Sequence, residues 1–254
     1  MKYLKYFLLG VFVVLSFYFT DKIMIYLENQ SPIMQKIMKQ EKKYKALPVN
    51  AEIENNTVVP GIKGKEINKR KSYAKMDDFG SFNEMFIIYD YLKPEVSLED
   101  NLDKVIIRGN KLKRAVAFVV EDSSIISFFE KNNLSYSLIS TLTSDLTKTR
   151  EYLLGEELKE NISDLKSLLN KNKLNSKTCL VNYSNIEYCK EKKYYIVAPD
   201  VDTGINITQL LPNISSGNII LVRKSTSEQN LDLILKEIKK QDLDIVYLSD
   251  LIKE

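Results

Sequence analysis

The feature that most constrains this chain is an alternation of apolar runs and amphipathic segments that begins near residue 112. Several of the runs are continuously apolar, which is typical of parallel strands covered on both faces. Segments with apolar residues at helical spacing lie between them. Strands are predicted at 115–120, 134–139, 177–183, 193–198, 218–222 and 243–248, and helices at 123–132, 156–171 and 226–241. Repeated strand–helix units predict an α/β fold, and periodicity alone does not choose between a parallel sheet and a barrel.

The N-terminus carries an uncharged run from Tyr6 to Thr20, preceded by Lys2 and Lys5. Fifteen helical residues span only about 22 Å, but snorkelling lysines and the apolar residues after Lys22 extend the segment. Residues 1–22 are therefore predicted to be a signal anchor or transmembrane helix, with a cleaved signal peptide and a buried N-terminal helix as alternatives. The preceding lysines place that end in the cytoplasm, so the expected location is the cell membrane, single-pass, with an extracellular C-terminal domain.

The rest of the chain divides by composition into three parts. Residues 23–46 are predicted to form a helical stalk interrupted by Pro32, and residues 47–110, with scattered Pro and Gly, a small α+β domain. The strand–helix alternation then fills residues 111–254.

Charge excludes one class of partner and suggests another. The 37 basic residues barely exceed the 34 acidic ones, so no general affinity for nucleic acid is expected. Residues 62–75, IKGKEINKRKSYAK, carry six Lys or Arg and one Glu. This segment is either a solvated loop or a contact for anionic wall polymers or lipid headgroups.

The two cysteines, Cys179 and Cys189, are interpreted as either a disulfide or a pair of buried thiols. A disulfide is allowed outside the cytoplasm. Two Cys in a chain without histidine do not make a structural zinc site of the usual kind.

Residues 115–123, AVAFVVEDS, form an apolar strand that ends in two adjacent acids, Glu121 and Asp122. Asp122 precedes Ser-Ser-Ile-Ile and is well placed to cap the following helix. Farther along, the chain contains YYIVAPDVDT at 194–203 and SGNIILVRKSTSEQNLDLILKEIKKQDLDIVYLSDLI at 216–252.

These segments resemble the polysaccharide deacetylase (NodB homology) domain, over residues 112–252. VAFVVED is similar to that family's first motif, an apolar strand that ends Thr-Phe-Asp-Asp. YYIVAPDVDT resembles the strand that ends near a Trp-x-Val-Asp segment, and 216–252 resembles the closing strand, helix and strand. The resemblance implies a distorted, incomplete (β/α) barrel preceded by the transmembrane helix and the small α+β domain.

The resemblance carries over few catalytic groups. Glu121 and Asp122 stand where the family has its general base and a metal ligand. The family's His-x-x-x-His motif has no counterpart, because the chain has no histidine. LVNYS (180–184) keeps only Tyr183 of the third motif, and Arg223, followed by Lys224, stands at the position of the catalytic histidine.

Metal-dependent hydrolysis needs a metal to activate water and a group that protonates the leaving amine. Arginine cannot serve as that acid. Arg223 or Lys224 is instead expected to pair with Glu121 or Asp122, where the metal would lie.

The resemblance therefore implies no cofactor and a non-catalytic glycan-binding or scaffolding protein at the bacterial cell surface, with Tyr183, Arg223 and Lys224 as binding candidates. Its partners would be the membrane and cell-wall glycan or an anionic wall polymer. One alternative is a divergent deacetylase or carbohydrate hydrolase with a carboxylate-only metal site at Asp122, Asp200 and Asp202. Another is that residues 47–110 carry the function.

Overall fold

The strand at the centre of the structure is β6 (Ala115–Val120), whose six residues are all buried. Alternate side chains of a strand point to opposite faces, so Val116, Phe118 and Val120 join one hydrophobic cluster. The two alanines and Val119 join a second cluster on the other face. Burial on both faces is the reason why the sequence of this strand is continuously apolar.

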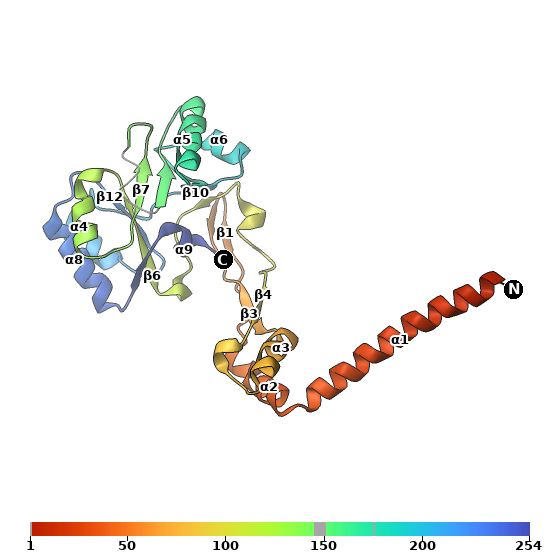
Figure 1. Ribbon diagram of the computed structural model, residues 1–254. Coiled ribbons are helices and arrows are strands. Elements are labelled where there is room, and N and C mark those ends of the chain that lie inside the picture. The colour runs from red at the N-terminus through yellow and green to blue at the C-terminus, as the bar shows by residue number, and fades with distance from the viewer. Residues whose placement is uncertain (1, 145–150, 175) are drawn as a thin grey trace. The chain divides into compact units, whose positions relative to one another are not determined.

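The computed structural model describes residues 2–144, 151–174 and 176–254 (Figure 1). The main sheet has eleven strands in the order β1-β2-β5-β10-β9-β8-β7-β6-β12-β11, and β13 also pairs with β6. From β5 to β11 neighbouring strands are parallel. The strands are β1 (Glu52–Glu54), β2 (Thr57–Val59), β3 (Gly64–Ile67), β4 (Tyr89–Leu92), β5 (Val105–Ile106), β6, β7 (Ser137–Ser140), β8 (Glu151–Leu154), β9 (Thr178–Leu180), β10 (Tyr195–Val197), β11 (Val201–Asp202), β12 (Ile219–Val222) and β13 (Asp244–Val246).

The α-helices are α1 (Lys2–Gln30), α2 (Pro32–Tyr44), α3 (Lys69–Phe79), α4 (Ile126–Lys131), α5 (Lys159–Lys171), α6 (Ile186–Glu191), α7 (Ile207–Leu210), α8 (Glu228–Lys240) and α9 (Leu248–Ile252). Short 3-10 segments are η1 (Glu84–Phe86), η2 (Glu99–Asn101), η3 (Lys111–Lys113), η4 (Ser123–Ile125) and η5 (Leu211–Asn213).

Helices cover both faces of the main sheet. The buried side chains of α4, α5, α6 and α8 belong to the cluster that contains Phe118. On the other face, α9 contributes Leu248, Leu251 and Ile252 to the cluster that contains Val119. The short C-terminal helix α9, the deep blue helix of Figure 1, therefore packs on the face of the sheet opposite to α4, α5, α6 and α8.

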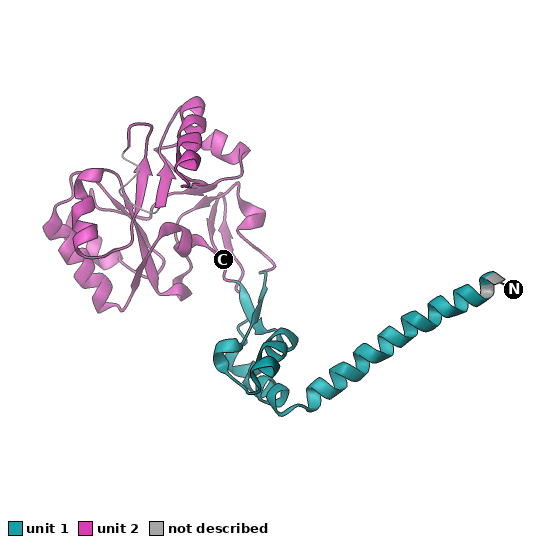
Figure 2. Cartoon of the chain, viewed as in Figure 1, with its two compact units in different colours: residues 1–48, 63–93 teal, residues 49–62, 94–254 magenta. Residues whose placement is uncertain are grey.

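The chain forms two compact units (Figure 2). Unit 1 comprises residues 1–48 and 63–93, and unit 2 comprises residues 49–62 and 94–254. The predicted domain boundaries differ from this division. Residues 49–62 and 94–110 supply β1, β2 and β5 to the main sheet, because their short strands pair with each other and with β10.

Residues 32–44, predicted as part of a stalk, instead pack within unit 1. Met34 and Ile37 of α2 are buried, and Ile37 clusters with Ile67 of β3 and Met76 of α3. Pro32 begins this helix, as the predicted interruption suggested, because proline fits the first turn but breaks a helix interior.

Helix α1 contains a 26-residue segment, Lys5–Gln30, that is long and apolar enough to cross a membrane. A signal sequence near an N-terminus meets the same criteria. The helix is thus compatible with both the predicted anchor and the predicted alternative of a cleaved leader.

Two strands at the sheet were not predicted. β8 occupies residues before the predicted helix at 156–171 for which no element was predicted, and β11 has only two residues. The predicted strand at 134–139 is shifted, since β7 covers Ser137–Ser140. A two-residue strand such as β11 leaves no periodicity to detect.

Candidate functional site

Polar side chains gather where four parallel strands end. Glu121 follows β6, Tyr183 lies in the loop after β9, Asp202 ends β11 and Arg223 follows β12. The carboxyl ends of parallel strands in one sheet meet at the same edge, where α/β proteins place their ligand sites. All four residues, Glu121, Tyr183, Asp202 and Arg223, were sequence-based candidates, Asp202 as a possible metal ligand.

The Arg223 guanidinium is the centre of this site. Its Nε donates to both Asp202 carboxylate oxygens, at 3.0 and 3.1 Å, and its Nη2 donates to Asp202 Oδ2 at 2.6 Å. Its Nη1 donates to the Tyr183 hydroxyl and lies 3.4 Å from Glu121 Oε1. The hydrogen bonds that Arg223 donates to Asp202, together with the neighbouring negative charge, raise the Arg223 pKa above its ordinary value, so this group stays cationic.

Glu121 accepts from several donors. Oε1 accepts from the Tyr183 hydroxyl at 2.8 Å, and Oε2 accepts from the Lys224 backbone N–H at 2.8 Å. Burial raises the pKa of this carboxyl, but these hydrogen bonds and the charge of Arg223 outweigh burial, so the net pKa is lowered. Glu121 is therefore an anion, and both of its carboxylate oxygens accept hydrogen bonds from neighbouring groups.

Tyr183 is held in the loop between β9 and α6, and a disulfide joins Cys179 of β9 to Cys189 of α6. Of the two interpretations of these cysteines, the structure has the disulfide. Burial, then the hydrogen bond to Glu121, raises the pKa of the Tyr183 hydroxyl to about 12. The hydroxyl thus stays protonated and links Arg223 to Glu121.

Asp122 and Lys224 form a second, more peripheral contact. Asp122 caps η4, because its Oδ1 accepts from the Ser124 backbone N–H at 2.8 Å. Its Oδ2 lies 3.6 Å from Lys224 Nζ. Hydrogen bonds from Ser124 lower the Asp122 pKa. Both basic residues therefore form ion pairs with the two acids. Arg223 pairs with Glu121 and, at a shorter distance, with Asp202, whereas Lys224 pairs with Asp122.

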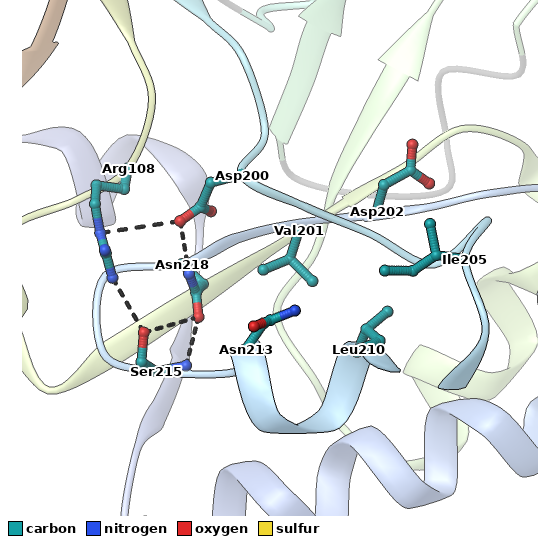
Figure 3. Close-up of a pocket in the computed structure, with 9 residues that line it drawn as sticks. All are labelled: Arg108, Asp200, Val201, Asp202, Ile205, Leu210, Asn213, Ser215 and Asn218. Carbon is teal, nitrogen blue, oxygen red and sulfur yellow. Dashed lines mark hydrogen bonds and ion pairs between the residues drawn. The ribbon is translucent and has the colours of Figure 1, made fainter. Parts of the chain in front are cut away.

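Asp200 belongs to a different cluster, shown in Figure 3. Its Oδ1 accepts from the Ile219 backbone N–H at 2.8 Å, its Oδ2 accepts from Asn218 at 2.6 Å, and Arg108 Nε is 3.9 Å away. Burial raises the Asp200 pKa. This cluster borders a cavity of about 270 Å³ that also touches Asp202.

The proposed carboxylate-only metal site is not assembled by these residues. In the part of the chain that the structure describes, no group of three or more Cys, Asp or Glu side chains is placed to hold a metal ion. Asp202 is bound by Arg223, Asp122 caps a helix, and Asp200 is bonded to Asn218. A cationic guanidinium between Glu121 and Asp202 also opposes a divalent ion at that position.

Three residues were not predicted: Thr203 and Thr226 at the Arg223 site, and Arg108 in the Asp200 cluster. Thr203 Oγ1 accepts from the Arg223 backbone N–H at 2.9 Å and lies 2.5 Å from Thr226 Oγ1. Arg108 reaches Asp200 and donates to Ser215 at 3.1 Å. The position of Thr203 directly after Asp202 was the available signal, whereas nothing local marks Arg108, which follows β5.

The parallel half-barrel and the polar site at its strand ends define a domain with the fold of the carbohydrate esterase family 4 (CE4), the polysaccharide deacetylase fold. The predicted fold class is confirmed. A wild-type CE4 family pseudoenzyme from Bacillus anthracis superposes with a TM-score of 0.58 and 18% identity, covering 89% of this chain and 96% of that one. A mutant of that pseudoenzyme with restored enzymatic activity gives a TM-score of 0.57 at 18% identity, covering 88% and 99% of the two chains.

The sequence relationship is narrower than the structural one. The uncharacterized protein YlxY of Bacillus subtilis is 27% identical over 141 residues, which are 55% of this chain and 42% of that protein. The match thus spans less than half of the curated relative. No protein-family model matches the chain.

Proposed function

We propose that this protein is a membrane-anchored, non-catalytic CE4-type protein that binds glycan or acts as a scaffold at the bacterial cell surface. The observation that carries the proposal is the position of Arg223. Its guanidinium is bonded to Asp202, Tyr183 and Glu121 at the strand ends, where a hydrolase would need a metal and a titratable acid.

The chemistry of the remaining groups supports the absence of hydrolysis. The lowered pKa of Glu121 makes this carboxylate a weaker base, and its oxygens already accept hydrogen bonds. Arg223 cannot release a proton to a leaving amine near neutral pH. The network is therefore suited to fix the shape of the strand ends, and unsuited to move protons.

Two observations support an extracytoplasmic location for unit 2. The Cys179–Cys189 disulfide is of the kind that persists in oxidising compartments. Helix α1 is long and apolar enough to anchor the chain, and Lys2 and Lys5 precede its apolar run, which favours a cytoplasmic N-terminus.

The glycan class rests on the CE4-type fold and on Tyr183 at the strand ends. An aromatic ring beside polar groups suits a sugar ring, which offers hydroxyls and an apolar face. Anionic wall polymer is the other proposed partner, for the basic segment at residues 62–75.

The test is acetate release by the full-length protein from N-acetylated chitooligosaccharides and peptidoglycan, across a panel of divalent metals. The expected result is no release above the protein-free control with any metal. Metal-dependent release that disappears in an Asp122→Ala variant would overturn the proposal.

Glycan binding is tested on the same oligosaccharides by saturation-transfer NMR. Binding is expected for the native protein, is expected to be lost in Tyr183→Ala, and is expected to persist in Tyr91→Ala, which removes an exposed tyrosine of unit 1. Equal binding by the two variants would remove the strand ends as the glycan site and leave only the scaffold role.

A further inference from the structure

The charge of this protein is divided unequally between its two units (Figure 2). Unit 1 carries 15 Lys and Arg against 8 Asp and Glu, whereas unit 2 carries 22 against 26. The net charge of +3 for the chain therefore conceals a basic unit of +7 and an acidic unit of −4. The basic unit is the one that contains the candidate membrane helix.

Much of this charge lies on one side of α2. Lys36, Lys39 and Lys43 are spaced by three and four residues, so they share a face of the helix, and Lys42 lies beside them. We define these four exposed lysines as the basic face. The buried residues of α2, Met34 and Ile37, face into unit 1, so the basic face points outward from this unit.

Most of the basic face is not neutralised by the protein. Lys43 lies 3.4 Å from Glu84, with both side chains at least half exposed. Within the described residues, Lys36, Lys39 and Lys42 form no ion pair. Four lysines on two turns of helix repel one another, so an external anion would stabilise this arrangement.

The chain connectivity brings the basic face to the end of the membrane helix. Helix α1 ends at Gln30 and α2 begins at Pro32, with Ser31 as its N-cap, so one residue separates the two helices. Arg70 of α3 also contacts α1, through Asp21 at 3.0 Å and Glu28 at 3.7 Å. Asp21 is the first charged residue after the apolar run. These ion pairs therefore join α3 to the C-terminal part of α1, which follows the apolar run.

We propose that the basic face of α2 binds the headgroups of anionic lipids around the anchoring helix. This inference rests on the proposed membrane anchoring. An anionic surface attracts lysines over about one Debye length, roughly 10 Å at 0.1 M salt. The short connection to α1 and the ion pairs of Arg70 with Asp21 and Glu28 keep this part of the chain beside the segment of α1 that follows the apolar run. Helix α2 would then lie against the membrane surface.

The test is lysine-selective chemical labelling of the full-length protein in lipid nanodiscs, with each site read by mass spectrometry. One set of discs contains phosphatidylcholine alone and the other also contains phosphatidylglycerol. Lys36, Lys39 and Lys42 are expected to label more slowly in the anionic discs, by at least about threefold, and to recover in about 1 M salt. Lys131, Lys236 and Lys239 are exposed in unit 2 and serve as internal controls with equal rates in both discs.

A fluorophore on a Gln35→Cys variant reports the same contact by a second method. Gln35 is exposed next to Lys36. The emission of a fluorophore at this position is therefore expected to shift to shorter wavelength in anionic discs. The shift is expected to disappear in Lys36→Gln/Lys39→Gln/Lys42→Gln. It is expected to remain in the matched variant Lys131→Gln/Lys236→Gln/Lys239→Gln, which loses the same charge in unit 2.

Equal labelling in the two kinds of disc, or an unchanged fluorescence shift in the α2 variant, would overturn the proposal. Protection in neutral discs after addition of soluble polyglycerol phosphate, with none from anionic lipid, would also overturn it and assign the face to a free polyanion. Failure of the protein to enter neutral discs would instead contradict the anchoring itself, so the two proposals fail by different measurements.

Discussion

Arg223 and Asp202 form a bidentate ion pair at the carboxyl ends of β12 and β11. Nε lies 3.0 and 3.1 Å from the two carboxylate oxygens, and Nη2 lies 2.6 Å from Oδ2. These strands are direct neighbours in the sheet, so the pair joins two adjacent strand ends. The remaining nitrogen of the guanidinium reaches Tyr183 and Glu121, which extends the connection to β9 and β6.

Arg223→Ala is predicted to destabilise unit 2, because it leaves Glu121 and Asp202 without their shared cation. The side chains of Arg223 and Asp202 are 36% and 38% exposed, so solvent screens the pair. The expected loss is about 1–2 kcal/mol. Urea unfolding of the full-length protein, followed by hydrogen exchange of peptides from β6 and β12, measures it within unit 2.

Lys159→Ala is the matched control for that substitution. It also removes one cation from an ion pair of unit 2, with Glu191 at 3.2 Å, but both side chains are more exposed. Its expected effect is below about 0.5 kcal/mol. Equal losses in the two variants would show that Arg223 forms an ordinary surface pair.

The Arg223 network is predicted to lose its stabilising effect in acid. The folded protein lowers the pKa of both Asp202 and Glu121 from ordinary values of 3.8 and 4.5. The stabilisation is therefore fully present above these values and is lost as the pH falls through the lower folded pKa values. Asp202→Asn should cost about 1 kcal/mol at pH 7 and progressively less below about pH 4.

The pH series uses Asp242→Asn as a control, because Asp242 pairs with Arg114 on the surface with 94% of its side chain exposed. Urea unfolding at several pH values between 7 and 3 compares both variants with the native protein. A cost of Asp202→Asn that is the same at every pH would contradict the role given to its ionised carboxylate.

Removal of the Cys179–Cys189 disulfide is predicted to weaken the loop that holds Tyr183. The bond closes a loop over a sequence separation of 10. Removing a cross-link that closes a loop of this length lowers the free energy of unfolding by about 3 kcal/mol in the chain-entropy description. The measurement is urea unfolding with and without reductant. The Cys179→Ala/Cys189→Ala variant should not respond to reductant, and a native protein equally insensitive would contradict the prediction.

The sequence predicted most of unit 2 because its long elements have clear patterns. The strand at 115–120 coincides with β6, and the helix predicted at 226–241 contains α8. The resemblance to a known domain supplied the barrel type, which periodicity alone did not. The two-residue β11 is too short to show a period, whereas the four-residue β8 was missed although β12 has the same length and was predicted.

The sequence identified most residues of the site but not which of these residues pair with one another. Arg223 was expected to face Glu121 or Asp122, but the carboxylate nearest to its guanidinium is that of Asp202. Asp200 and Asp202 were grouped with Asp122 as possible carboxylate ligands of a metal. The side chains of Asp202 and Asp200 instead bind Arg223 and Asn218, a separation that depends on the placement of β11 beside β12. Such long-range pairing is fixed by the tertiary fold and leaves no local signal.

We infer that the Arg223 guanidinium stands in place of a metal at the strand ends. The most direct test is the metal content of the full-length protein after equilibration with zinc, cobalt, nickel and manganese ions, each followed by removal of unbound ions. The account predicts metal well below one equivalent for every ion, in the native protein and in Asp122→Ala alike. One equivalent of a divalent metal that is bound by the native protein and lost in Asp122→Ala would contradict it.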